Sequence, residues 1–143
     1  MDCKSLMIGD WFQTTYPNGK TEYRQVRGIV KGDVAEHVIH DNGVTNAIEP
    51  IPLTAEILEK NGWKKVFDKV DYMVKYDLAK EGKNCWMMWA IKEHNLDIQR
   101  QDEKLDMYNL KVQMVCMPCD FVHELQRALR CCGLFDKAND IVV

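Results

Sequence analysis

The chain has 143 residues, of which 46% are hydrophobic and 29% charged, and its formal net charge is -3 at pH 7. These values are typical of one soluble globular domain, and no apolar run reaches the roughly 18 residues that a membrane-spanning helix needs. Residues 1–62 carry nine acids and six bases and residues 63–143 carry thirteen of each. Neither half has the basic surplus of a protein that binds a phosphate backbone, so we expect no membrane partner and disfavour nucleic acid.

The N-terminal segment and the cysteines both indicate a cytoplasmic protein. MDCKSLMIGDWF contains no apolar stretch of signal-peptide length and no small-residue cleavage site. The cytosol keeps cysteines reduced, so we expect the six cysteines to be free thiols rather than a disulfide framework. No Gly-rich phosphate loop, GxSxG, HExxH or Asp-rich calcium loop is present, and we expect no cofactor.

Short strands separated by tight turns are predicted from Ile8 to Ile48. Pro17-Asn18-Gly19, Lys31-Gly32-Asp33 and Asp41-Asn42-Gly43 supply turn residues between segments rich in Val, Ile, Tyr and Thr. We expect an antiparallel β-meander of about four strands in residues 1–52, compatible with an SH3-like barrel. Side chains alternate along a strand, so His37 and His40 are expected on opposite faces and not in one metal site.

The segment IEPIPLTAEILEKNGW predicts a short helix. Two prolines favour an extended entry, Thr54 is a good N-cap, and Gly62 is a natural C-terminal stop. The residues between them, Ala55 to Lys60, are good helix formers. Ile57 and Leu58 are expected to face the core.

A second antiparallel sheet is predicted from Trp63 to Met117. Its expected strands are KKVF, DYMVKYDL, NCWMMWAI and MYNLKVQMVCM. The segment HNLDIQRQDEKLD is polar, and we interpret it as a long exposed excursion whose acids, Asp97 to Asp106, form a solvated face rather than a metal or general-acid site.

The strand NCWMMWAI is apolar on both faces. Trp86, Met88 and Ala90 alternate with Met87, Trp89 and Ile91, so a cover is needed on each side. The C-terminal helix can cover one side. The other side needs the N-terminal meander or, in the alternative, a second copy of the chain in a homodimer.

A C-terminal helix is predicted from Phe121 to Cys132, capped by Asp120 and ended by Gly133. Its apolar stripe would pack on the sheet. The opposite side is expected to be solvated, and it carries the three residues His123, Arg127 and Arg130.

The stretch VCMPCDFVHELQRALRCCG holds four of the six cysteines. The pairs at its two ends lie about 20 Å apart along a helix, too far to share one zinc ion, so we expect no metal. Cys116-Met117-Pro118-Cys119 has the form of a redox motif at a helix N-terminus. A thiol-disulfide oxidoreductase with Cys116 as nucleophile and Cys119 as resolving thiol is therefore one alternative, although the further strands of a thioredoxin-type fold have no room after Gly133. We favour structural, buried cysteines.

Aromatic residues supply the candidate binding contacts. These are Trp11, Tyr16, Tyr23, Trp86 and Trp89, the last two depending on which face of their strand stays open. A second alternative is a small nucleic-acid-binding domain that stacks bases on the meander and uses Arg24, Arg27 and Lys31, although three charges make a weak electrostatic footprint.

Three stretches together carry a resemblance. IGDWF with its following hairpin, IEPIPLTAEILEKNGW and FVHELQRALRCCG resemble a family of small uncharacterised bacterial proteins of gut anaerobes, their prophages and other mobile elements. The family pattern runs IGN, PIPLTEE, GF and VHxLQ. Asp10 stands where the family has Asn, Trp63 where it has Phe, and the CMPC motif is not part of the pattern. The resemblance implies a cytoplasmic role in a mobile element and transfers no catalytic residue.

The sequence thus predicts an α+β fold: an N-terminal β-meander, a short helix, a second antiparallel sheet, and a C-terminal helix packed on that sheet. The domain is expected to be single, residues 1–143, with sub-lobes at residues 1–52 and 53–143. We expect a non-enzymatic interaction module with a protein partner or self-association.

Overall fold

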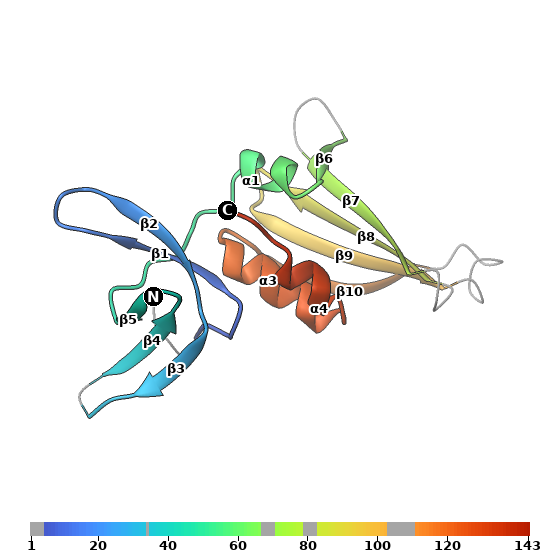
Figure 1. Cartoon of the computed structure of the whole chain (residues 1–143). Helices are drawn as coiled ribbons and strands as arrows, with labels where there is room; N and C mark the ends of the chain where they lie inside the picture. Colours follow the sequence, from blue (N-terminus) through green and yellow to red (C-terminus); the bar gives the residue numbers. More distant parts are fainter. Residues whose placement is uncertain (1–4, 34, 67–70, 79–82, 103–110) are drawn as a thin grey trace.

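The computed structural model describes residues 5–33, 35–66, 71–78, 83–102 and 111–143. The fold is α+β as predicted, with antiparallel sheets of two, three and five strands and short helices. Figure 1 shows the two small sheets at one end of the molecule, the five-stranded sheet at the other, and α3 and α4 between them. Among the described residues, no helix has the length and apolar character needed to cross a bilayer.

The N-terminal lobe has five strands in two sheets instead of one meander of about four. Its turns lie where the sequence predicts them, and Gly19 and Gly43 have φ angles of 82° and 143°, which suit glycine. Leu6, Phe12, Val26, Val38 and Ile48 form its own small core. The strands are β1 (Trp11–Thr15), β2 (Thr21–Gln25), β3 (Gly28–Lys31), β4 (Glu36–His40) and β5 (Gly43–Thr45), ordered β1-β2 and β3-β4-β5.

Helix α1 (Ala55–Lys60) confirms the predicted short helix. The Thr54 side chain accepts a hydrogen bond from the Ile57 amide at 3.3 Å, as an N-cap does. Gly62 follows with a φ of 86°. Leu58 is fully buried and Ile57 packs beside the core, because both face the sheet.

The proline-containing approach to α1 lies beside the start of the C-terminal helix. The Leu53 amide donates to the Asp120 carbonyl at 2.7 Å, and the Val122 amide donates to the Ile51 carbonyl at 3.0 Å. Pro52 and Phe121 form the bridge between these two hydrogen bonds. Two motifs that are far apart in the sequence therefore stabilise each other directly.

The five-stranded sheet has the order β10-β9-β8-β7-β6. One prediction within it is wrong: Asn95–Asp102 is not an exposed excursion but strand β9, which lies between β8 and β10. Leu96 and Ile98 are fully buried, because they meet Trp89 and Met87 across the ladder. Residues 103–110, part of the predicted excursion, lie outside the described residues. The other strands are β6 (Lys64–Lys65), β7 (Asp71–Leu78), β8 (Lys83–Ala90) and β10 (Lys111–Pro118).

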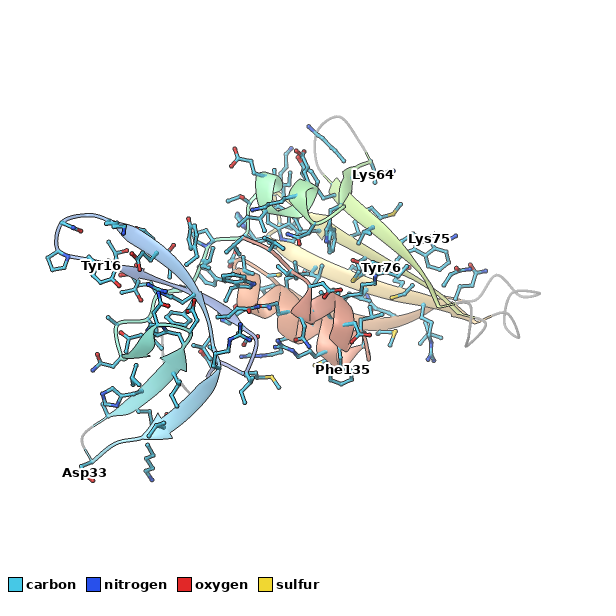
Figure 2. All side chains as sticks on the ribbon, viewed as in Figure 1. Tyr16, Asp33, Lys64, Lys75, Tyr76 and Phe135 are labelled. Carbon is cyan, nitrogen blue, oxygen red and sulfur yellow. The ribbon has the colours of Figure 1, made fainter. Side chains whose placement is uncertain are left out.

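One face of this sheet builds the main core. Cys85, Met87 and Trp89 are all at most 4% exposed, and they pack with residues of α1 and of the C-terminal helices. Side chains fill the space between this face and the helices (Figure 2). We call this the inner face of the sheet and the opposite one the outer face.

The C-terminal region holds two helices, α3 (Val122–Cys131) and α4 (Phe135–Asn139). The N-cap of α3 is Phe121 and not Asp120. The Glu124 side chain accepts from the Asp120 and Phe121 amides at 2.8 and 3.2 Å. Gly133 ends the helix with a φ of 78°, as predicted.

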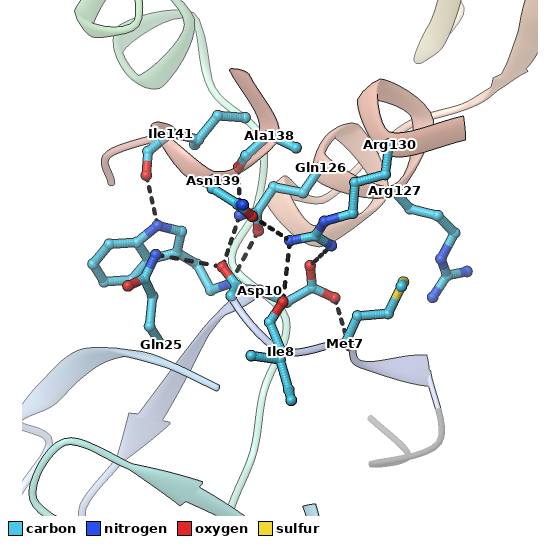
Figure 3. A network of polar contacts seen from close by, with 12 residues as sticks. Met7, Ile8, Asp10, Gln25, Gln126, Arg127, Arg130, Ala138, Asn139 and Ile141 are labelled. Carbon is cyan, nitrogen blue, oxygen red and sulfur yellow. Dashed lines mark hydrogen bonds and ion pairs between the residues drawn. The ribbon is translucent and has the colours of Figure 1, made fainter. Parts of the chain in front are cut away.

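The predicted solvated side of the C-terminal helix is also wrong in part, because the N-terminal lobe covers it. His123 is 6% and Arg130 is 8% exposed. Arg130 forms a buried ion pair with Asp10, whose other carboxylate oxygen accepts from the Met7 amide at 2.8 Å. This is the centre of a junction between the two lobes (Figure 3).

Gln126 completes the junction from the middle of α3. Its side chain accepts from the Trp11 amide at 3.0 Å and donates to the carbonyls of Gly9 and Ala138 at 3.0 and 2.9 Å. The Trp11 indole donates to the Ile141 carbonyl at 2.7 Å. The lobes are thus joined by specific hydrogen bonds on groups that are shielded from water, as Figure 3 shows.

Candidate functional site

The outer face of the five-stranded sheet carries a hollow of about 250 Å³. Met73, Trp86 and Met88 supply its apolar lining, and Asp97 and Gln99 its polar lining. These residues come from three neighbouring strands, because Met88 is paired with Met73 on one side and Asp97 on the other. Helices cover the inner face of the sheet. The N-terminal lobe does not lie over the outer face (Figure 1).

Charged and amide groups border this hollow. The Lys75 ammonium lies 5.3 Å from the centroid of the Trp86 ring, a cation–π distance. The carboxylate of Asp97 accepts from the side-chain amides of Gln99 and Gln113 at 2.8 and 3.0 Å. Asp97 is the ionisable residue among those that line the hollow. The surface therefore combines adaptable methionines, one aromatic ring and one fixed negative charge.

The structure separates the predicted tryptophan contacts. Trp89 lies on the inner face, is 4% exposed, and donates its indole N–H to the Cys119 carbonyl at 2.8 Å. Trp11 is used in the junction described above. Trp86 is the one of these three that lies on the outer face, where it is half-buried.

The predicted tyrosine contacts lie on the N-terminal lobe and point to different sides of the β1–β2 hairpin. Tyr16 is 40% exposed, lines a hollow with Arg24 and His40, and donates to Glu22 at 3.3 Å. Tyr23 is 53% exposed and lies opposite Gln13 in the strand register. It therefore has no part in the Tyr16 hollow.

Arg24 is not a free basic contact. Its guanidinium is paired with Glu22 and with Asp41, and only 14% of its side chain is exposed. The nucleic-acid alternative needs an uncompensated positive charge here. The ion pairs therefore argue against it. Arg27 and Lys31 are exposed.

The geometry of the CMPC motif argues against the thiol-disulfide alternative. Cys116 is exposed on the outer face, whereas Cys119 is buried. Residues 116–118 are part of an extended strand, which places the two Cα atoms about 10 Å apart, beyond the roughly 7 Å limit for a disulfide. Burial, together with the nearby Glu124 and Asp120 carboxylates, raises the pKa of Cys119 to about 12. A thiol of this kind is inert at neutral pH.

The other thiols and the histidines that the structure describes form no assembled site. Burial raises the pKa of Cys132 to about 11 and also raises that of Cys85. Within the described ranges, His, Cys, Asp and Glu side chains nowhere gather in a group of three that could hold a metal ion. The Nδ1 atom of His40 accepts from the Asn42 amide at 3.2 Å, which engages that ring nitrogen in its own turn.

Sequence reasoning did not single out Met73, Asp97 and Gln99 as site residues. Met73 and Trp86 are 13 positions apart in the chain, and the polar composition of Asn95–Asp102 does not by itself predict a strand beside them. The alternation of Leu96 and Ile98 with Asp97 and Gln99 is the signal that could have placed β9 in the sheet.

No family model, curated protein sequence or solved structure matches the chain. The function of the chain is therefore inferred from the chemistry of its described surfaces alone.

Proposed function

We propose that this chain is a non-enzymatic interaction module that binds a segment of another protein on the outer face of its five-stranded sheet. The observation that supports the proposal best is the hollow formed by Met73, Trp86 and Met88. Side chains of this kind are usually covered in a folded domain, but among the described residues the helices pack on the inner face, whereas these three side chains line a hollow on the outer face. Large aromatic and methionine side chains at an open surface are typical of binding hot spots.

The chemistry of the hollow defines the kind of segment that fits. Methionines repack around differently shaped apolar side chains, and Trp86 offers a wide apolar area at low entropic cost. Asp97 adds a negative charge at the polar edge of the hollow. We therefore expect an amphipathic segment with an apolar anchor for the methionines and a basic side chain for Asp97.

The cellular setting is part of the same proposal. The resemblance of the PIPLT and VHELQ segments to small proteins of bacterial mobile elements and prophages supports a cytoplasmic role in such an element. The thiol chemistry of CMPC and nucleic-acid binding by Arg24 lack a geometry that favours them, as described above. A homodimer through the outer face is the main competing occupant.

The test compares partner capture by tagged full-length variants under reducing conditions, with both protein and nucleic acid measured in the eluate. Trp86→Ala and Met88→Asp alter the hollow, whereas Tyr23→Ala removes an exposed aromatic ring elsewhere. We expect a stoichiometric protein partner that both hollow variants lose and the Tyr23 variant keeps. A partner that all three variants retain contradicts the proposed surface.

A fluorophore at Cys116 provides a direct readout in a background that carries Cys3→Ser, Cys131→Ser and Cys132→Ser, which leaves the buried Cys85 and Cys119 as the other thiols. Cys116 is exposed and lies opposite Asp97, which is opposite Met88, so the three share one row across the outer face. A bound partner should change the emission of the dye. Light scattering of the same sample separates a partner complex from self-association, which would replace the hetero-partner by a second copy of the chain.

A further inference from the structure

A second surface lies on the N-terminal lobe, around the ring of Tyr16. A hollow of about 390 Å³ is lined by residues of the β1–β2 and β4–β5 hairpins, and a neighbouring hollow of about 430 Å³ continues along the β1–β2 turn. Both are lined in part by Tyr16 and Pro17. Tyr16 is labelled on this lobe in Figure 2. The two residues therefore form an apolar ridge with a hollow on each side.

The β4–β5 hairpin presents hydrogen-bond donors to the first hollow. The side-chain oxygen of Asn42 accepts from Arg24 in the orientation that satisfies both amide atoms. In that orientation its NH₂ group, which carries two N–H bonds, is directed at acceptors and not at the guanidinium. The Thr45 oxygen accepts from the Ala47 amide at 3.0 Å, so its hydroxyl proton is available to donate. The Nδ1 atom of His40 accepts from the Asn42 backbone amide, so the N–H donor of this ring is at Nε2. All three residues line the hollow.

Among the residues that line it, the hollow that contains these donors has no positive charge that lacks a carboxylate partner. Arg24 is held by Glu22 and Asp41, and a further carboxylate, Glu49, accepts from the Thr15 hydroxyl at 2.9 Å. A phosphate or carboxylate ligand would approach three carboxylates against two cations, the Arg24 guanidinium and the Lys20 ammonium of the second hollow, both of which are paired with Glu22. The hollow therefore suits a neutral group that accepts hydrogen bonds.

We propose that the Tyr16 hollows bind a proline-rich, extended segment of another protein. Each proline offers a carbonyl acceptor and no N–H that would need a partner, which matches a surface of neutral donors. Its ring is apolar and packs against Tyr16, Pro17 and Val44. The carbonyls of a polyproline II helix have no internal hydrogen bonds, and its three-residue turn repeats every 9 Å or so, which allows successive turns to straddle the Tyr16 ridge.

The probe is a fluorescein-labelled decaproline peptide, titrated with the full chain and followed by fluorescence anisotropy. A Gly-Ser peptide of equal length is the control, because it is flexible and carries backbone N–H groups. We expect saturable binding of decaproline with a Kd tighter than about 1 mM and no saturation with the Gly-Ser peptide.

Three matched variants locate the site. Asn42→Asp keeps an acceptor for Arg24 but removes the NH₂ donor, and Tyr16→Ala removes the ridge. Both positions are exposed, so the fold should persist, and circular dichroism checks this. We expect about tenfold weaker binding or worse for each, and a change of less than about twofold for Tyr23→Ala on the other side of the hairpin.

The outcomes are independent of the outer-face proposal, because Trp86→Ala should bind decaproline like the unmodified chain. Absence of saturable binding would overturn the inference. Equal binding of the Gly-Ser peptide would do the same, and so would a decaproline affinity that neither Asn42→Asp nor Tyr16→Ala changes. Binding of a thymidine oligonucleotide with loss on adding salt would assign the hollows to nucleic acid instead.

Discussion

The core beneath the five-stranded sheet and the junction between the lobes hold the molecule together in different ways. The core is apolar, with Met87, Leu96 and Ile98 fully shielded from water. The junction buries polar groups: Asp10 and Gln126 are also fully shielded. Burial of apolar surface stabilises any compact arrangement, whereas buried donors and acceptors favour only the arrangement in which each finds its partner.

The core therefore contributes mainly to the stability of the fold, whereas the junction determines how the two lobes are oriented. The core tolerates hydrophobic replacements of similar volume, because dispersion and the hydrophobic effect are not directional. The junction requires matched partners such as Arg130 and Asp10, and so it fixes how the N-terminal lobe sits on α3. Substitutions that leave one partner unpaired there should have the largest effects.

The first prediction concerns a substitution that disrupts the junction at Asp10. Asp10→Ala leaves the Arg130 guanidinium buried without its carboxylate, and we expect the free energy of unfolding to fall by about 3–5 kcal/mol. The control is Asp41→Ala, which removes an exposed carboxylate 3.5 Å from Arg24 and should cost less than about 1 kcal/mol. Urea denaturation measures both. Similar losses for the two variants would contradict a special role for the junction.

The second prediction compares the two faces of β8. Met87 is fully buried on the inner face, and Met87→Ala should lower the free energy of unfolding by about 2–5 kcal/mol through lost burial and a cavity. Its neighbour Met88 is half-buried on the outer face, and Met88→Ala should cost about 1 kcal/mol or less. Thermal unfolding followed by circular dichroism gives both values. A larger loss at Met88 would mean that the outer face is covered within the chain.

The third prediction concerns hydrogen-bond polarity at Gln126. Gln126→Glu keeps the shape of the side chain but turns the donor toward the Gly9 and Ala138 carbonyls into an acceptor. We expect a loss of about 1–3 kcal/mol, measured by urea denaturation at pH 7. Asn139→Asp, which keeps an acceptor for Arg130, is the matched control and should change stability little. Equal stability of the two variants would show that Gln126 does not fix the junction.

The smallest effect is a pH dependence through His123. Burial lowers the pKa of His123 below its ordinary value, while nearby Glu124 and Asp10 act in the opposite direction. The unfolded chain therefore binds a proton more readily, and the contribution of the neutral ring to stability is present above about pH 6.5 and declines as the pH falls below it. The difference in urea midpoint between pH 7.5 and 5.5 should shrink in His123→Gln. An unchanged difference would exclude His123 as its source.

Much of the local structure follows from neighbouring residues. The helix that the sequence predicts begins after Thr54 and ends before Gly62. Gly19 and Gly43 lie in turns that require a positive φ angle. The strand Asp71–Leu78 also lies where its alternation places it. In each case the signal is a short-range preference of the backbone, which the fold does not override.

The main errors arose where distant segments decide the environment. Strand β9 has only two apolar residues among eight, and Leu96 and Ile98 are buried because β8 and β10 flank them. Sequence periodicity predicts a solvated polar side of α3, yet Arg130 on that side is buried in an ion pair with Asp10 of the N-terminal lobe. Helical or strand periodicity predicts which residues share a face of the element. It does not predict which other segment of the chain covers that face.

The candidate surfaces also depend partly on local sequence preferences and partly on contacts between distant segments. The sequence alone determined that β8 would have apolar residues on both faces and that Tyr16 would lie beside a tight turn, because alternation and turn chemistry are local. Only the tertiary structure decided that the helices take the face with Trp89 and leave the face with Trp86. That choice depends on contacts such as the hydrogen bond from the Trp89 indole to the Cys119 carbonyl, whose residues are 30 positions apart. No local preference encodes such a contact, because its free energy arises only when the chain has folded.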